Sequence, residues 1–125
     1  MSAKMNILKE LEKEMYLFNI GEHLESYRFL GSKQRTENGI EGWRFTVWAP
    51  HAKTVSLVGD FTEWKPVEMQ KIGKTGGWSH FTVAAAQGDC YKYYIEDKNG
   101  KKKYKIDPYS FAYEVPPKDA SVVFD

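Results

Sequence analysis

The sequence predicts an all-β fold, a β-sandwich of about seven short strands that follows an N-terminal helical arm. Apolar residues change from helical spacing before residue 20 to alternation from residue 42 onward. Segments rich in β-branched and aromatic residues then recur about every ten residues, and Gly, Pro and Asn separate them. Because 125 residues are enough for one hydrophobic core, we expect a single sandwich with a helical extension.

The helical arm is predicted over residues 1–35. Within it, residues 6–18 form an amphipathic helix whose apolar face carries Ile7, Leu8, Leu11, Met15 and Phe18. Asn6 has the side chain of a helix cap. A second short helix is expected after Asn19, because Glu22 follows it at the spacing of a capping pair, and Gly31 would end that helix.

The sandwich is predicted over residues 36–125 and is expected to be immunoglobulin-like. Its strands are expected at residues 43–48, 54–58, 78–83, 91–96, 102–106 and 121–124. Five lysines lie between residues 98 and 105, beside the turn residues Asn99-Gly100. This pattern is typical of an exposed sheet edge that must stay unpaired, so we interpret it as an edge strand and not as a phosphate-binding patch.

Charge and cysteine content exclude several classes of function. Lys plus Arg number 18 and Asp plus Glu 17, so the net charge is +1 and no basic excess favours nucleic acid or an anionic membrane. Cys90 is the only cysteine, so no intrachain disulfide can form. The first ten residues contain charges before any apolar run, which indicates neither a signal peptide nor a membrane span. We therefore expect a cytoplasmic protein.

No group of residues in the sequence forms a catalytic, metal or cofactor site. The three histidines are scattered, and none has a partner at metal-ligand spacing. Glycoside chemistry needs two carboxyl groups that flank one bond, but Asp60 and Glu63 belong to a tight turn where such residues serve backbone hydrogen bonds. Asp107, which precedes Pro108, is interpreted as a turn former in the same way. We expect no catalytic residues and no cofactor.

Several motifs occur in the order of one known family. They are Gly42-Trp43-Arg44-Phe45-Thr46-Val47-Trp48-Ala49-Pro50, Gly59-Asp60-Phe61-Thr62-Glu63-Trp64, Tyr91-Lys92-Tyr93-Tyr94-Ile95 and Asp107-Pro108-Tyr109. Together they resemble the isoamylase-type N-terminal domain, a carbohydrate-binding module of enzymes that modify starch and glycogen. The opening segment from Phe18 to Gly31 and the tail from Asp107 to Val123 resemble those of bacterial glycogen branching enzymes, except that Ser32-Lys33 replaces the family's usual Ala-His.

The resemblance implies a non-catalytic module. In that family a catalytic (β/α)8 barrel follows this domain and carries the reacting carboxyl groups, and the parent enzyme transfers α-1,4-glucan chains into α-1,6 linkages. The implied partners are therefore an α-glucan, either glycogen or a maltooligosaccharide, and the barrel. Two alternatives stay open: a scaffold that packs on the barrel without sugar affinity of its own, and a similar module from a debranching or trehalose-releasing enzyme.

The resemblance also implies which residues bind glucan. In the family's glycogen-binding members two aromatic rings and a lysine hold the sugar, and these match Trp64, Tyr104 and Lys92. Tyr104 shares the sheet face of Lys92 only if Lys98-Asn99-Gly100 is a three-residue loop, which pairs Tyr104 with Tyr94. A two-residue loop would pair it with Ile95 and place it on the other face. The position of Gly100 favours the longer loop, so we predict one surface carrying Trp64, Lys92, Tyr94 and Tyr104.

Overall fold

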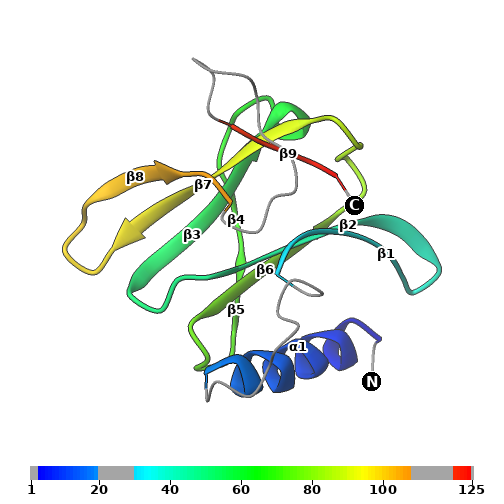
Figure 1. Ribbon diagram of the computed structural model, residues 1–125, viewed down its shortest axis with the longest axis horizontal. Coiled ribbons are helices and arrows are strands. Elements are labelled where there is room, and N and C mark those ends of the chain that lie inside the picture. Colours follow the sequence, from blue (N-terminus) through cyan, green and yellow to red (C-terminus); the bar gives the residue numbers. More distant parts are fainter. Residues whose placement is uncertain (1–2, 20–29, 108–119, 125) are drawn as a thin grey trace.

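The computed structural model describes residues 3–19, 30–107 and 120–124, and it confirms an all-β sandwich with an N-terminal helix. Two antiparallel sheets face each other, and the helix lies below them in Figure 1. The first sheet has the strand order β1-β2-β6-β5. Its strands are β1 (Gly31–Glu37), β2 (Ile40–Trp48), β5 (Gln70–Ile72) and β6 (Gly77–Thr82).

The second sheet has the order β4-β3-β7-β8, and a short further strand, β9, also pairs with β7. Its strands are β3 (Ala52–Gly59), β4 (Val67–Glu68), β7 (Cys90–Asp97), β8 (Lys102–Lys105) and β9 (Ser121–Val122). A 3-10 turn, η2 (Asp60–Thr62), follows β3. β8 is an edge strand with all four residues exposed, which confirms the interpretation of the lysine cluster.

Alternation along the strands builds the core between the two sheets. In β7 the residues Tyr91, Tyr93 and Ile95 are buried, whereas Lys92 and Tyr94 between them face outward. Aromatic and aliphatic side chains of both sheets meet inside: Trp43, Phe45, Val47, Val55, Leu57, Met69 and Trp78 join the β7 residues. Each fully buried side chain of this size contributes about 1.5–3 kcal/mol through the hydrophobic effect. Burial of Tyr91, Tyr93 and Ile95 therefore determines that Lys92 and Tyr94 lie on the opposite, outer face of β7.

The helix α1 (Ala3–Asn19) packs on the first sheet through a second, smaller cluster. Ile7, Leu11 and Met15 follow at i, i+4 and i+8 and are buried against Leu30 and Ile72. Met15 lies so close to β6 that a Cβ added at Gly77 would be 3.0 Å from its methyl carbon. The predicted amphipathic helix is therefore confirmed, with its apolar face against β5 and β6. It begins at Ala3, however, so Asn6 lies inside the helix and the prediction that Asn6 caps it is wrong.

Strands β1, β4 and β5 are absent from the sequence prediction. The predicted boundary between residues 35 and 36 falls inside β1, so the first sheet starts at Gly31. The segment has no apolar alternation, but Asn38-Gly39 is a strong two-residue hairpin signal, and both residues have positive φ. The predicted second helix and most of the tail lie outside the described residues. Within the described ranges no helix is long and apolar enough to cross a membrane.

Candidate carbohydrate-binding surface

The β7–β8 hairpin has the register that the three-residue loop requires. Tyr94 pairs with Tyr104, and Tyr93 pairs with Lys105. Gly100 has a φ of 84° and its N–H donates to the Asp97 carbonyl. The Asp97 carboxylate accepts the N–H groups of Asn99 and Lys101 at 2.8 and 2.9 Å, which closes the turn. The predicted register is confirmed. Tyr104 of β8 lies on the same outer face of the second sheet as Lys92 of β7.

Tyr94 and Tyr104 form a pair of aromatic rings on that face. Their ring centroids are 4.8 Å apart with an angle of 39° between the planes, and Tyr104 is 57% exposed. Lys92 lies two residues before Tyr94 on the same side of β7 and pairs with Val58 of β3. An exposed ring supported by a second ring offers an apolar plate, and a nearby ammonium group can donate hydrogen bonds to hydroxyls.

Trp64 is held at the end of β3 by Asp60. The Trp64 indole Nε1–H donates to Asp60 Oδ1 at 3.0 Å, and the backbone N–H of Cys90 donates to Asp60 Oδ2 at 2.8 Å. Asp60 thus joins the turn to the first residue of β7. This confirms that Asp60 serves the turn's hydrogen bonds, and it places Trp64 beside the start of β7, beyond the Tyr94–Tyr104 pair.

The backbone at Trp64 is strained. Glu63 and Trp64 have φ values of 55° and 59°, in the left-handed region that bulky residues rarely adopt. The Trp64 N–H donates to the Gly59 carbonyl at 3.0 Å and stabilises this conformation. The indole remains 43% exposed. Strain that the surrounding structure maintains at an exposed ring is typical of a pre-organised contact residue.

Asp107 has a role that the sequence interpretation missed. Its carboxyl oxygen Oδ2 accepts the hydroxyls of Tyr91 and Tyr93 at 2.6 and 3.1 Å, and its N–H donates to Ser121 Oγ at 2.8 Å. All four residues are fully buried. Burial raises the pKa of the Tyr93 hydroxyl well above its usual value, and Asp107 and Tyr91 raise it further. Asp107 is a structural acceptor in the core, and no local pattern around it predicts this.

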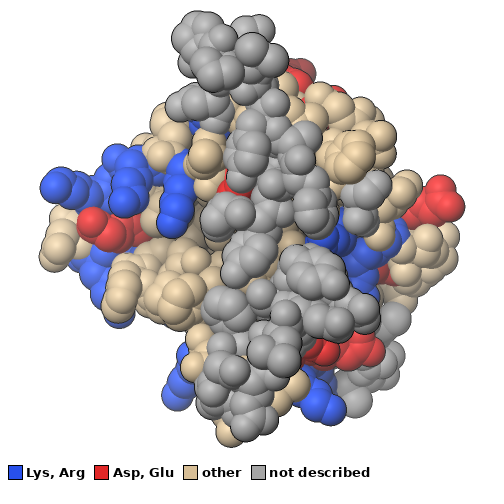
Figure 2. Space-filling view, in the orientation of Figure 1, with Lys and Arg blue, Asp and Glu red and all other residues tan. Residues whose placement is uncertain are grey.

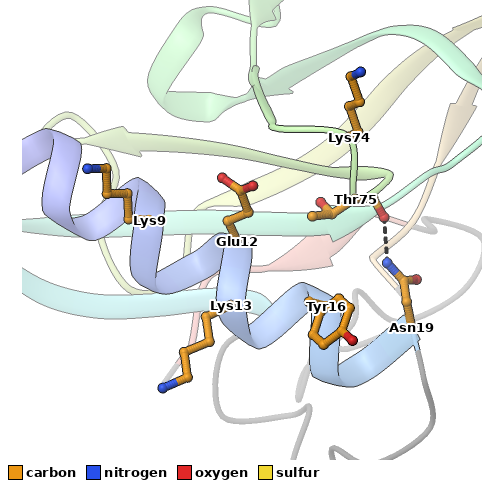
Figure 3. A pocket seen from close by; sticks show the side chains of 7 residues that line it. All are labelled: Lys9, Glu12, Lys13, Tyr16, Asn19, Lys74 and Thr75. Carbon is orange, nitrogen blue, oxygen red and sulfur yellow. Dashed lines mark hydrogen bonds between the residues drawn. The ribbon is translucent and has the colours of Figure 1, made fainter.

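A groove beside α1 differs in chemistry from the aromatic surface. A groove of about 610 Å³ lies between α1 and the β5–β6 turn, where the Asn19 side chain donates to the Thr75 carbonyl (Figure 3). Among the described residues that line it, Tyr16 is the one aromatic ring, and the others are Lys9, Glu12, Lys13, Asn19, Lys74 and Thr75. Within the described residues no three His, Cys, Asp or Glu side chains gather closely enough to hold a metal ion.

Curated proteins of similar sequence include 1,4-alpha-glucan branching enzymes. The 1,4-alpha-glucan branching enzyme GlgB of Bacillus cytotoxicus is 44% identical over 123 residues, which is 97% of this chain and 19% of that protein. The branching enzyme GlgB 1 of Clostridium perfringens is 44% identical over 115 residues, 90% of this chain and 17% of that protein. The chain therefore spans less than a fifth of the length of these relatives.

Solved structures share the fold at lower sequence identity. Pullulanase from Bacillus acidopullulyticus superposes with a TM-score of 0.62 at 28% identity, over 77% of this chain and 12% of that chain. Pullulanase from Anoxybacillus sp. LM18-11, solved in complex with maltotetraose, superposes with a TM-score of 0.63 at 26% identity, over 78% of this chain and 14% of that chain. A family model described as carbohydrate-binding module 48 (isoamylase N-terminal domain) matches residues 29–110, more than half of the sequence. The chain therefore belongs to carbohydrate-binding module family 48, the isoamylase-type N-terminal domains.

Proposed function

We propose that this domain binds α-1,4-glucan weakly and thereby positions the catalytic barrel of a 1,4-alpha-glucan branching enzyme on its polymer. This chain covers less than a fifth of those relatives, so the proposal assigns the barrel and its chemistry to sequence outside this chain. The branching enzymes are 44% identical to this chain, whereas the two pullulanases are 28% and 26% identical. This difference favours a branching enzyme over a debranching enzyme as the parent protein.

The observation that supports the proposal most directly is the Tyr94–Tyr104 ring pair on the same face as Lys92. Glucose rings have apolar C–H faces and a rim of hydroxyls, so they stack on aromatic plates and accept or donate hydrogen bonds at the edges. Trp64 supplies a further exposed indole from the β3–β4 connection. In the proposed surface Trp64 and Tyr104 contact the sugar faces and Lys92 donates to hydroxyls.

The expected affinity is low because the surface is shallow. Two exposed plates and a few hydroxyl contacts give about −4 to −5 kcal/mol, which corresponds to roughly millimolar dissociation constants. Glycogen presents many chain ends, so a tethered module raises the local concentration of the enzyme on the polymer without tight binding. Weak binding is therefore sufficient for positioning.

Native electrophoresis in gels that contain glycogen tests the proposal. Glycogen should retard the domain, Trp64→Ala should abolish most of the retardation, and Tyr104→Ala should reduce it. Tyr104→Phe keeps the ring and should migrate like the wild type. Tyr16→Ala removes another exposed ring, on α1, and serves as a matched control. A wild-type domain that migrates at the same rate with and without glycogen would reject sugar binding.

A scaffold function is the second candidate, and one observation favours it. Ile40 and Val83 are 54% and 65% exposed at the same end of the first sheet, next to the paired residues Trp43 and Thr82. Exposed aliphatic side chains at one end of a domain suit contact with a neighbouring domain. If glycogen does not retard the domain, this scaffold function becomes the preferred explanation.

A further inference from the structure

The structure contains a concave site with an exposed indole, Trp48, at the other end of β3 from Trp64. Its cavity of about 440 Å³ is lined by Trp48, Ala49, Pro50, His51, Ala52, Ile95, Asp97, Lys103 and Lys105. We propose that this Trp48 groove, defined by those residues, binds a second segment of α-1,4-glucan. The inference shares the ligand class of the proposed function, but it concerns different residues.

The wall of the Trp48 groove is rigidly built. Gly76 has a φ of 84°, and a Cβ added there would lie 2.9 Å from Pro50 Cβ and 3.0 Å from Trp48 Nε1. The Ala49 N–H donates to the Gly76 carbonyl at 2.7 Å, and the Trp78 indole N–H donates to the Ala49 carbonyl at 3.2 Å. The connection between β2 and β3 is thus fixed from two sides, with Trp48 still 41% exposed.

The opposite wall comes from the inner side of β8. Lys103 pairs with Ile95 and Lys105 with Tyr93, so both lysines lie on the side of β8 opposite to Tyr104. Ala52 and Ile95 are buried and form an apolar floor. Figure 2 shows basic side chains over the β7–β8 hairpin at the left, with an uncharged area below them over the β2–β3 connection. Strand β8 therefore separates the surface that carries Tyr104 from the groove that carries Trp48.

The chemistry of the groove suits a neutral sugar. An indole and a proline ring give an apolar wall for C–H faces, and His51, Asp97 and the two lysines bring both hydrogen-bond donors and acceptors to the rim. A glucose unit satisfies both the apolar wall and the mixed rim.

Two sites at opposite ends of β3 would make the domain bivalent. Trp48 and His51 precede the strand and Trp64 follows it, and eight residues of β-strand span roughly 25 Å. Neighbouring chains of one glycogen particle can occupy both sites at once, so each weak contact raises the effective concentration of glucan at the other. Retardation by glycogen should therefore exceed what either site gives alone.

Tryptophan fluorescence can read the two sites separately. Trp43 and Trp78 are only 5% and 4% exposed, so acrylamide should quench chiefly Trp48 and Trp64. In Trp64→Phe the accessible fluorescence reports on the Trp48 groove, and in Trp48→Phe it reports on Trp64. The double variant gives the baseline of the buried indoles. Maltoheptaose is the probe, and the β-1,4-linked cellohexaose is the control ligand.

Saturating maltoheptaose should remove the acrylamide-accessible component of Trp64→Phe, down to the baseline of the double variant, and cellohexaose should not. An unchanged accessible component in that variant would overturn the Trp48 groove. If Trp48→Phe is then protected, the proposed glucan surface still stands. Protection in Trp64→Phe alone would support the groove and reject the Trp64 surface, and no protection in either variant would reject both.

Discussion

The buried hydrogen bonds at Asp107 give a sharp test of what stabilises the sandwich. Tyr91 and Tyr93 both donate their hydroxyls to Asp107 Oδ2, and all three side chains are fully buried. Asp107→Ala removes the acceptor that the two buried hydroxyls share. Because a buried hydroxyl that loses its acceptor cannot turn to bulk water instead, we expect a large loss of stability from this single change.

The magnitude follows from the two hydrogen bonds that are lost. Each buried hydroxyl that loses this acceptor costs about 1–3 kcal/mol, and water entering the small cavity would recover part of this, so we expect a loss of about 3 kcal/mol. With a urea dependence of about 1.5 kcal/mol per molar, the unfolding midpoint should fall by about 2 M. The free energy of unfolding is measured by circular dichroism in urea at pH 7.

Two variants at the same site serve as controls. Asp107→Asn keeps a carbonyl oxygen that can accept from a tyrosine, so its loss should be smaller than that of Asp107→Ala. Tyr93→Phe removes one donor and leaves Asp107 bonded to Tyr91, at a cost of about 1 kcal/mol. An Asp107→Ala domain within about 0.5 kcal/mol of the wild type, the range typical of ordinary surface substitutions, would refute the reasoning.

Three further predictions concern pH, a turn and an ion pair. Because the pKa of Tyr93 is raised in the folded state, the stability that its protonated hydroxyl contributes should be fully present below about pH 10 and be lost above it, by up to about 1.4 kcal/mol per pH unit, and urea titrations of Tyr93→Phe should show a shallower fall. Gly100→Ala should cost about 1 kcal/mol in the same assay, because φ is 84° and no atom obstructs the added methyl group. Glu37→Ala should cost about 3 kcal/mol, since it removes the carboxylate partner of the buried Arg44 guanidinium, which donates to both Glu37 oxygens at 2.7 Å and would keep its hydrogen bond to the Ser79 hydroxyl; a loss below about 1 kcal/mol would contradict this.

Local sequence chemistry was sufficient for the β7–β8 hairpin and its exposed face. The alternation from Tyr91 to Ile95 determines which side chains enter the core, and Asp97 and Gly100 determine the turn and therefore the register. These features act over a few residues, so the pattern alone predicted that Tyr104 would meet Tyr94. The same holds for α1, whose apolar spacing predicted its buried face.

Strand β1 shows where apolar alternation fails as a signal, although the Asn38-Gly39 turn after it is a local one. Its residues, Gly31–Glu37, are almost all polar, so no alternation distinguishes it from a loop. It is a strand because its backbone pairs with β2 and because Glu37 forms a buried ion pair with Arg44, seven residues away. Pairing with a neighbour and a buried ion pair are tertiary effects, and tertiary context overrides weak intrinsic preference.

The sequence by itself determined the class of fold, the family and the exposed face of one hairpin, because these depend on periodicity and on turn residues close in the chain. Only the tertiary structure determined that Asp107 accepts the hydroxyls of Tyr91 and Tyr93 in the core, and that Trp48 lines one groove together with the lysines of β8. Each of these contacts joins segments between 14 and 57 residues apart by their numbering, from Tyr93 to Asp107 and from Trp48 to Lys105. Such contacts form only when the two sheets close on a common core, so no local pattern can encode them.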